Sequence, residues 1–199
     1  MIEKIFSFDG WYYRIFSFLA NLIIVNILFL MSAMTVILTG PSLIAFYQTI
    51  DKLTKHQEGS IVKTYFTELI NALKKGFMLT ITLICIIGGG IGSVYLLMEN
   101  LPTLGFLAVI VMTLIVLYET IFIIVFARFP FTFKKTLRET AYILLSSTAH
   151  GIVLLVVPVL VLLILGKINL WLCVIVGFGL SGWLQTIFFN KVLVDNDGK

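Results

Sequence analysis

The sequence predicts an all-α fold, a polytopic membrane helix bundle of about five transmembrane helices with two or three further helices at the cytoplasmic interface. Five stretches are apolar over lengths near the roughly 20 helical residues that cross a bilayer core about 30 Å thick. Hydrophobic residues make up 60% of the chain and charged residues only 12%, whereas soluble domains have roughly 45–50% and 25%. The 199 residues therefore form a single integral membrane domain, residues 1–199.

The apolar stretches place the spans near residues 15–39, 77–98, 103–127, 149–166 and 168–190. Between them, residues 61–75 and 131–147 carry apolar side chains at helical spacing and lysine or arginine on the other positions. This pattern predicts amphipathic helices that lie on the cytoplasmic leaflet. Pro130 marks the bend after the third span, because proline does not fit inside a regular helix.

A short apolar segment, residues 42–50, follows the Thr39-Gly40-Pro41 sequence that ends the first span. Nine residues are too few to cross a bilayer. We therefore expect a broken helix that dips along or into the cytoplasmic interface. The alternative is that this segment pairs with another helix and crosses again, which would move the N-terminus to the inside.

Lysine and arginine residues fall mostly on one side of a five-span arrangement, eleven against three. Because cytoplasmic loops carry the basic excess, this predicts an outside N-terminus and a cytoplasmic C-terminus. The net charge of +4 is then expected to face anionic lipid, not nucleic acid. Four basic residues after the third span form a candidate docking site for a partner: Arg128, Lys134, Lys135 and Arg138.

Polar residues inside the spans are few, and four of them form a candidate intramembrane site: Glu119, Asn21, Asn26 and Gln185. A charged side chain at the bilayer centre costs about 3 kcal/mol or more. Glu119 is therefore either an ion or proton site, a polar contact to a partner subunit, or a protonated structural residue. The amides are expected to make interhelical hydrogen bonds that fix helix packing.

Small residues form two flat faces, Gly88 with Gly92 in the second span and Gly177 with Ser181 in the fifth. Such faces let helix backbones approach closely. We expect them to pack spans two and five together or to receive a partner. A helix break that opens a substrate path is the alternative.

Catalytic and metal-binding chemistry is not indicated. No Ser/His/Asp, Cys/His or paired-carboxylate arrangement can be assembled, so the sequence predicts neither an enzyme nor a cofactor. The two histidines, His56 and His150, are too isolated to suggest a metal site.

The N-terminal third carries a motif: residues 10–14 (GWYYR), Asn21-Leu22, Asn26, Thr39-Gly40-Pro41 and residues 45–47 (AFY), joined later by residues 127–129 (ARF). This motif resembles the YesL-like family of bacterial integral membrane proteins of unknown function. The chain departs from the family pattern at Ala33-Met34 and at Ala72-Leu73.

The resemblance implies a protein of the bacterial cytoplasmic membrane. Family members are commonly encoded beside carbohydrate importers of the ATP-binding-cassette (ABC) type, which suggests an accessory or assembly subunit of such an importer. Its expected partners are the importer's permease subunits or further copies of itself. No catalytic residues carry over from the family. The alternative is an independent small-solute transporter or channel that uses Glu119 and the asparagines.

Overall fold

The computed structural model describes the chain except for residues 1–10, 56, 58, 147 and 198–199. Its described residues are almost entirely helical, and five helices are long and apolar enough to cross a membrane. The predicted all-α membrane helix bundle is therefore confirmed, and the chain is a multi-pass membrane protein. The elements, in order, are α2 (Trp11–Ala33), η1 (Val36–Leu38), α3 (Thr39–Thr54), α4 (Ile61–Asn100), α5 (Pro102–Arg128), α6 (Phe133–Ser146), α7 (Thr148–Ile168), α8 (Leu170–Leu172), η2 (Cys173–Gly177) and α9 (Phe178–Asp197).

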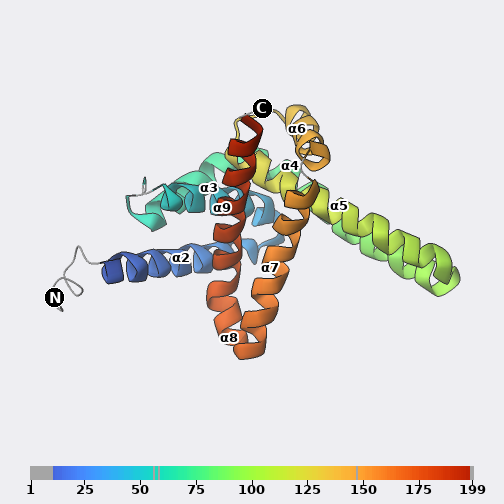
Figure 1. The fold of residues 1–199 in the computed structure, drawn as a ribbon, viewed down its shortest axis with the longest axis horizontal. Helices are drawn as coiled ribbons and strands as arrows, with labels where there is room; N and C mark the ends of the chain where they lie inside the picture. Colours follow the sequence, from blue (N-terminus) through green and yellow to red (C-terminus); the bar gives the residue numbers. More distant parts are fainter. Residues whose placement is uncertain (1–10, 56, 58, 147, 198–199) are drawn as a thin grey trace.

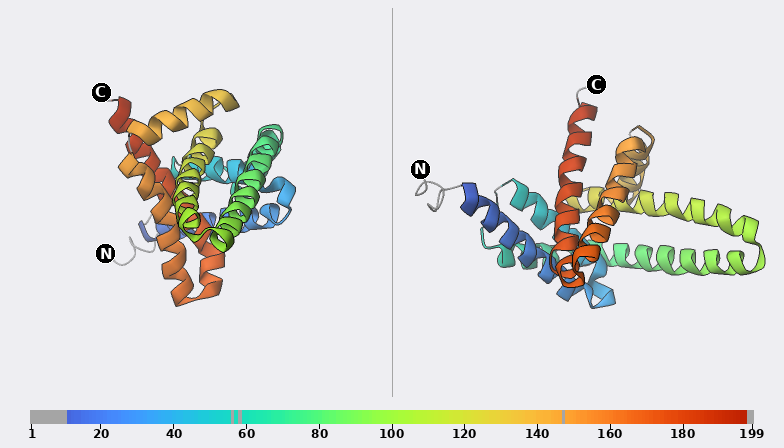
Figure 2. Two further views of the ribbon diagram at one scale, coloured as in Figure 1. Left: turned by 90° about the vertical axis from the view of Figure 1, so that its right-hand side faces the viewer. Right: turned by 60° about the horizontal axis from the view of Figure 1, so that its bottom comes forward.

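Two helical hairpins leave the bundle in different directions (Figure 1). The hairpin of α4 and α5 projects far to one side, and the hairpin of α7 and α9 turns at the short helix α8. Helices α2 and α3 pack beside both hairpins: α3 lies against α4 and α5, and α2 crosses the second hairpin toward its turn (Figure 2). The hydrophobic core is where these helices meet, and it draws buried residues from α2, α3 and both hairpins.

Helix α4 is continuous over 40 residues, so the predicted amphipathic helix at 61–75 and the second span are one element. Only Gly76 separates the two predicted pieces, and one glycine costs a helix about 1 kcal/mol relative to alanine, too little to end it. The helix stops at Asn100, where Pro102 follows as the first residue of α5.

Helix α3 differs most from the sequence expectation. The segment at 42–50 was expected at the interface, but it belongs to a 16-residue helix of which ten residues are buried. Ile44, Ala45 and Ile50 are at most 1% exposed. Helix α3 contacts α2, α4, α5 and α9, so it is the central element of the core.

A close crossing of backbones seats α3 against α4. A Cβ atom on Gly40 would overlap the carbonyl oxygen of Gly76, and a Cβ on Gly76 would overlap the backbone of Pro41. The Thr80 hydroxyl accepts a hydrogen bond from the Gly40 amide at 3.0 Å. Two glycines are therefore required where the helices meet, because any side chain would force their backbones apart.

Helix α6 packs on α5 through Thr136, Thr140 and Ile143, and the Tyr118 hydroxyl donates to the Leu137 carbonyl at 2.8 Å. The predicted helix at 131–147 is thus present but shorter. Its basic residues lie on the exposed face.

Candidate functional site

Asn26 completes the hydrogen bonding of an irregular segment in the last span. Residues Cys173–Gly177 form a π-helical turn, which disturbs the regular backbone ladder. The Asn26 amide nitrogen donates to the carbonyls of Val174 and Ile175, both at 2.7 Å, and its oxygen accepts from the Gly179 amide at 2.8 Å. In an apolar surrounding, backbone groups left without partners cost several kcal/mol each. The Asn26 side chain therefore uses its amide nitrogen and its oxygen to bond the backbone of the last span.

Gln185 performs a similar task for α7. Pro158 lies inside that helix and has no amide hydrogen, so it cannot donate to the carbonyl of Leu154 four residues earlier. The Gln185 amide nitrogen donates to that same carbonyl at 2.8 Å. Its oxygen accepts a hydrogen bond from the Tyr47 hydroxyl of α3 at 2.7 Å.

Glu119 stands apart from these two amides. Its side chain is buried, and its Oε2 atom has no hydrogen-bond partner among the residues that the structure describes. No hydrogen bond between described residues joins Glu119 to Asn26 or Gln185. Asn21 is only half-buried. The four residues of the predicted intramembrane site are therefore not connected to one another by hydrogen bonds in the described part of the chain.

The two predicted small-residue faces, on spans two and five, do not pack against each other. Nothing lies within 4 Å of a Cβ placed on Gly88 or Gly92, so this face of α4 is open and does not pack on the fifth span. Gly177 meets Leu162 of α7, and the Ser181 hydroxyl donates to the Gly177 carbonyl. The expected pairing of spans two and five is thus corrected: the fifth span packs on α2, α3 and α7.

Charged residues from three helices meet at one end of the core. Arg128, at the end of α5, forms a salt bridge with Asp51 of α3, and Asp51 also accepts from Lys55 at 2.6 Å. Lys52 of α3 pairs with Glu68 of α4. We call these five residues the charge cluster: Asp51, Lys52, Lys55, Glu68 and Arg128.

Arg128 differs from the other predicted docking residues. Its side chain is only 7% exposed, its Nη2 atom also donates to Asn190 of α9 at 2.7 Å, and its guanidinium lies over the ring of Phe189. Lys134, Lys135 and Arg138 are exposed on α6, and Lys135 lies 4.1 Å from the centroid of Phe131. Arg128 therefore joins α3, α5 and α9 inside the protein, and three basic residues remain for contact with a partner.

The partners of Arg128 were not found by sequence reasoning. Gln48 donates to the Ala127 carbonyl at 2.7 Å, so two consecutive residues of α5 are held by one turn of α3. The sequence does show three polar residues, Gln48, Asp51 and Lys52, at helical spacing near the end of the apolar segment 42–50. They would predict contacts with Arg128 only if that segment were already known to be buried.

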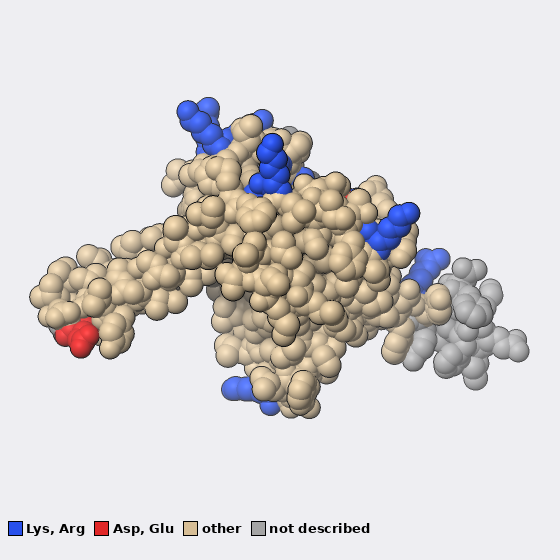
Figure 3. Space-filling model, turned by 180° about the vertical axis from the view of Figure 1, so that it is seen from behind, with Lys and Arg blue, Asp and Glu red and all other residues tan. Residues whose placement is uncertain are grey.

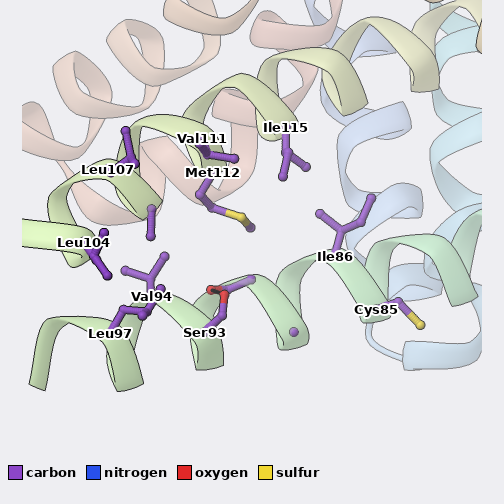
Figure 4. Close-up of a pocket in the computed structure, with 13 residues that line it drawn as sticks. Cys85, Ile86, Ser93, Val94, Leu97, Leu104, Leu107, Val111, Met112 and Ile115 are labelled. Atoms are coloured by element: carbon purple, nitrogen blue, oxygen red, sulfur yellow. Dashed lines mark hydrogen bonds between the residues drawn. The ribbon is translucent and has the colours of Figure 1, made fainter. Parts of the chain in front are cut away.

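The described residues line several cavities, and those at the charge cluster and along the α4–α5 hairpin bear on function. One of about 190 Å³ is lined by the charge cluster residues Asp51, Lys52, Glu68 and Arg128 together with Gln48. Two grooves of about 440 and 500 Å³ run along the α4–α5 hairpin, where Met112 points from α5 toward α4 (Figure 4). Among the described residues, no three His, Cys, Asp or Glu side chains come together as a metal site.

The basic surface is one-sided. Lysine and arginine gather over the end of the bundle that holds α6 (Figure 3), whereas the tip of the α4–α5 hairpin carries Glu99 and no basic residue. The turn end of the α7–α9 hairpin carries one basic residue among those described, Lys167 in the last turn of α7.

Comparison with known families agrees with the motif in the N-terminal third. A family model described as "Protein of unknown function, DUF624" matches residues 22–91, so the predicted resemblance to the YesL-like family is confirmed over that segment. The matched residues include Asn26, all of α3 and the Gly76 crossing. No curated protein and no solved structure matches the chain.

The bond between Gln185 and the Leu154 carbonyl predicts a coupling between Gln185 and Pro158. Gln185→Leu should destabilise the protein by about 1–3 kcal/mol, because it leaves a buried carbonyl without a donor. In a Pro158→Ala background the helix regains its own donor to Leu154, so the same change should cost about 1 kcal/mol less. Unfolding of the four proteins in mild detergent measures the coupling. Equal losses in both backgrounds would contradict this assignment.

Proposed function

We propose that this DUF624-type chain is a non-catalytic accessory or assembly subunit of a bacterial membrane complex. The proposed partners are the permease subunits of a carbohydrate importer of the ABC type, as the family resemblance implies. The observation that carries the proposal is the α4–α5 hairpin, which extends beyond the core and offers its surface to whatever surrounds it.

Between Ile81 and Val116, Gly105 is the only described residue that is buried. Its position at the hairpin interface is tight, since a Cβ there would come within 2.9 Å of Met98. The remaining apolar surface, with its two grooves, is available to lipid or to helices of a partner. The exposed Lys134, Lys135 and Arg138 of α6 offer a basic contact at another end of the bundle.

The interior polar groups favour this reading over a transport path. The side-chain amides of Asn26 and Gln185 already form hydrogen bonds with the protein's own backbone, so they are not free to bind a solute. The alternative function is an independent small-solute transporter or channel. The observation in its favour is the buried Glu119, whose Oε2 atom has no described partner.

Purification from the native host in a gentle detergent, followed by mass spectrometry, tests the proposal. The expected result is stoichiometric recovery of importer permease subunits, reduced when the α4–α5 surface is changed by Ile91→Trp together with Tyr95→Ala. Ile152→Trp, an exposed apolar position on α7, is the matched control.

Recovery of a lone chain or homo-oligomer would overturn the accessory role and favour the transporter. In that case reconstituted vesicles should show a solute flux that Glu119→Gln abolishes. An unchanged flux, or none in the parent protein, would remove the transporter as well.

We also propose an orientation in the bacterial cytoplasmic membrane, with both termini in the cytoplasm and α3 as a sixth crossing. It revises the expectation of an outside N-terminus. Support comes from the pairing of α2 with α9: the ring of Phe18 lies 5.2 Å from that of Trp183, Leu22 meets Gly179, and Asn26 reaches Val174 and Ile175. These contacts run antiparallel, so the start of α2 and the end of α9 lie toward the same side.

Helix α3 runs the opposite way to α2. Its start meets Gly76 and Thr80 of α4, whereas Lys52, near its end, meets Glu68, which is earlier in α4. Helix α3 is therefore antiparallel to α4. Its 16 residues span about 24 Å, and because the bundle buries them, they need not be apolar on every face.

The six-crossing arrangement sharpens the charge asymmetry. Lys4 and Arg14 move to the cytoplasmic side, so that 13 of the 14 lysine and arginine residues are cytoplasmic and only Lys167 is outside. This is a stronger positive-inside bias than the eleven against three of the five-crossing arrangement.

Labelling of single cysteines tests the orientation in a Cys85→Ala, Cys173→Ala background. A membrane-impermeant thiol reagent should label Asn100→Cys in intact cells. It should label a cysteine added to the N-terminus, and Lys199→Cys, only after the membrane is opened. Labelling of the N-terminal cysteine in intact cells, with Lys199→Cys still protected, would restore the five-crossing arrangement.

A further inference from the structure

Arg128 has binding capacity that the protein does not use. Its Nη2 atom is bonded to Asp51 and Asn190, but its Nη1 atom is buried and has no hydrogen-bond partner among the described residues. The side chain is 93% buried, the complement of its 7% exposure. A buried donor of this kind costs free energy until it finds an acceptor.

The cavity beside Arg128 is lined by polar and charged side chains. It has a volume of about 190 Å³, room for several water molecules at about 30 Å³ each. Lys52 and Arg128 line it, and Lys55, which is not in the lining, forms a salt bridge with Asp51. The carboxylates that line it, Asp51 and Glu68, are already paired with these cations. The lining itself holds two cations and two carboxylates, and Lys55, which pairs with Asp51 from outside the lining, gives the charge cluster as a whole one net positive charge.

We propose that this cavity binds a phosphoryl group, with Arg128 Nη1 and the Lys52 ammonium as its donors. A guanidinium presents a planar array of donors that suits the oxygens of phosphate, and an ammonium adds a mobile charge. The group could come from the headgroup of an anionic phospholipid or from a free phosphate compound. Under the proposed orientation the cavity lies at the cytoplasmic end of the core, where anionic headgroups and soluble phosphates are both present.

Bound phosphate would also fasten the helices that meet at the cavity. Gln48, Asp51 and Lys52 come from α3, Glu68 from α4 and Arg128 from α5. An anion held by Arg128 and Lys52 therefore bridges α5 and α3. Binding should stabilise the folded protein by an amount that grows with the logarithm of the ligand concentration once that concentration exceeds the dissociation constant.

Two assays on the purified full chain distinguish the sources. Native mass spectrometry after exchange into phosphatidylglycerol or phosphatidylcholine reports a retained lipid. Thermal unfolding against inorganic phosphate and glycerol phosphate, with equal ionic strength from chloride, reports a soluble anion. Preferential retention of phosphatidylglycerol supports a headgroup, and saturable protection by phosphate alone supports a soluble ligand.

Variants connect the binding to the cavity. Arg128→Gln should lower affinity at least about tenfold. Since Arg128 also holds the core together, Lys52→Gln provides a milder test, because Lys52 is 42% exposed. It should weaken binding several-fold and leave the fold intact. Lys167→Gln, an exposed change near the end of α7, is the matched control and should bind as the parent does.

Absence of both lipid retention and phosphate protection in the parent protein would overturn the proposal. Equal binding by Lys52→Gln and Lys167→Gln would overturn it too. Because both assays use the protein alone, their outcome is independent of whether importer subunits are its partners.

Discussion

The crossing of α3 over α4 at Gly40 and Gly76 is the contact on which the rest of the core depends. The backbones meet so closely that neither position has room for a Cβ atom. This approach brings α3 into the centre, where it touches four other helices. It also sets the position of the far end of α3, at which Asp51 reaches Arg128 and Lys52 reaches Glu68. Separation of the two backbones would therefore disturb the apolar core and the charge cluster together.

Apolar surroundings explain the other polar contacts. A π-helical turn in the last span and a proline in α7 each leave backbone groups without their usual partners. Asn26 and Gln185 supply what is missing. Both amides are therefore structural: Asn26 joins α2 to the last span, and Gln185 joins α9 to α7 and to α3. Among the described residues, the charged side chains that keep a buried polar atom without a hydrogen-bond partner are Glu119 and Arg128.

Sequence reasoning identified the parts of the fold that hydropathy determines. Long apolar runs located five membrane-spanning helices, and the Asn100–Pro102 boundary was visible as a polar break. Helix α3 was misplaced because its apolar run is short and its polar residues, among them Gln48 and Asp51, resemble those of a surface helix. Its burial comes from contacts with distant residues, and hydropathy does not report those.

The same limit applies to the candidate site. Small residues at Gly88 and Gly92 indicate a flat face, but the spacing alone does not say whether a helix lies against it. Arg128 looks like a cytoplasmic anchor in the sequence because it precedes a basic segment. Its burial follows only from the arrival of Asp51 and Asn190 from other helices. The sequence shows which residues are polar, but only the packing of the helices shows which of them are buried and paired.

One pair of substitutions in a single helix tests the central position of α3 most directly. Gly76→Ala and Gly88→Ala make the same change in α4, and alanine favours a helix over glycine by about 1 kcal/mol. The account predicts that Gly88→Ala leaves the thermal stability in detergent unchanged or slightly raised. Gly76→Ala should lower it by about 1–3 kcal/mol or more, because the new methyl group meets the backbone of Pro41. Equal stability of the two variants would show that α3 is not packed against Gly76 and would contradict the account.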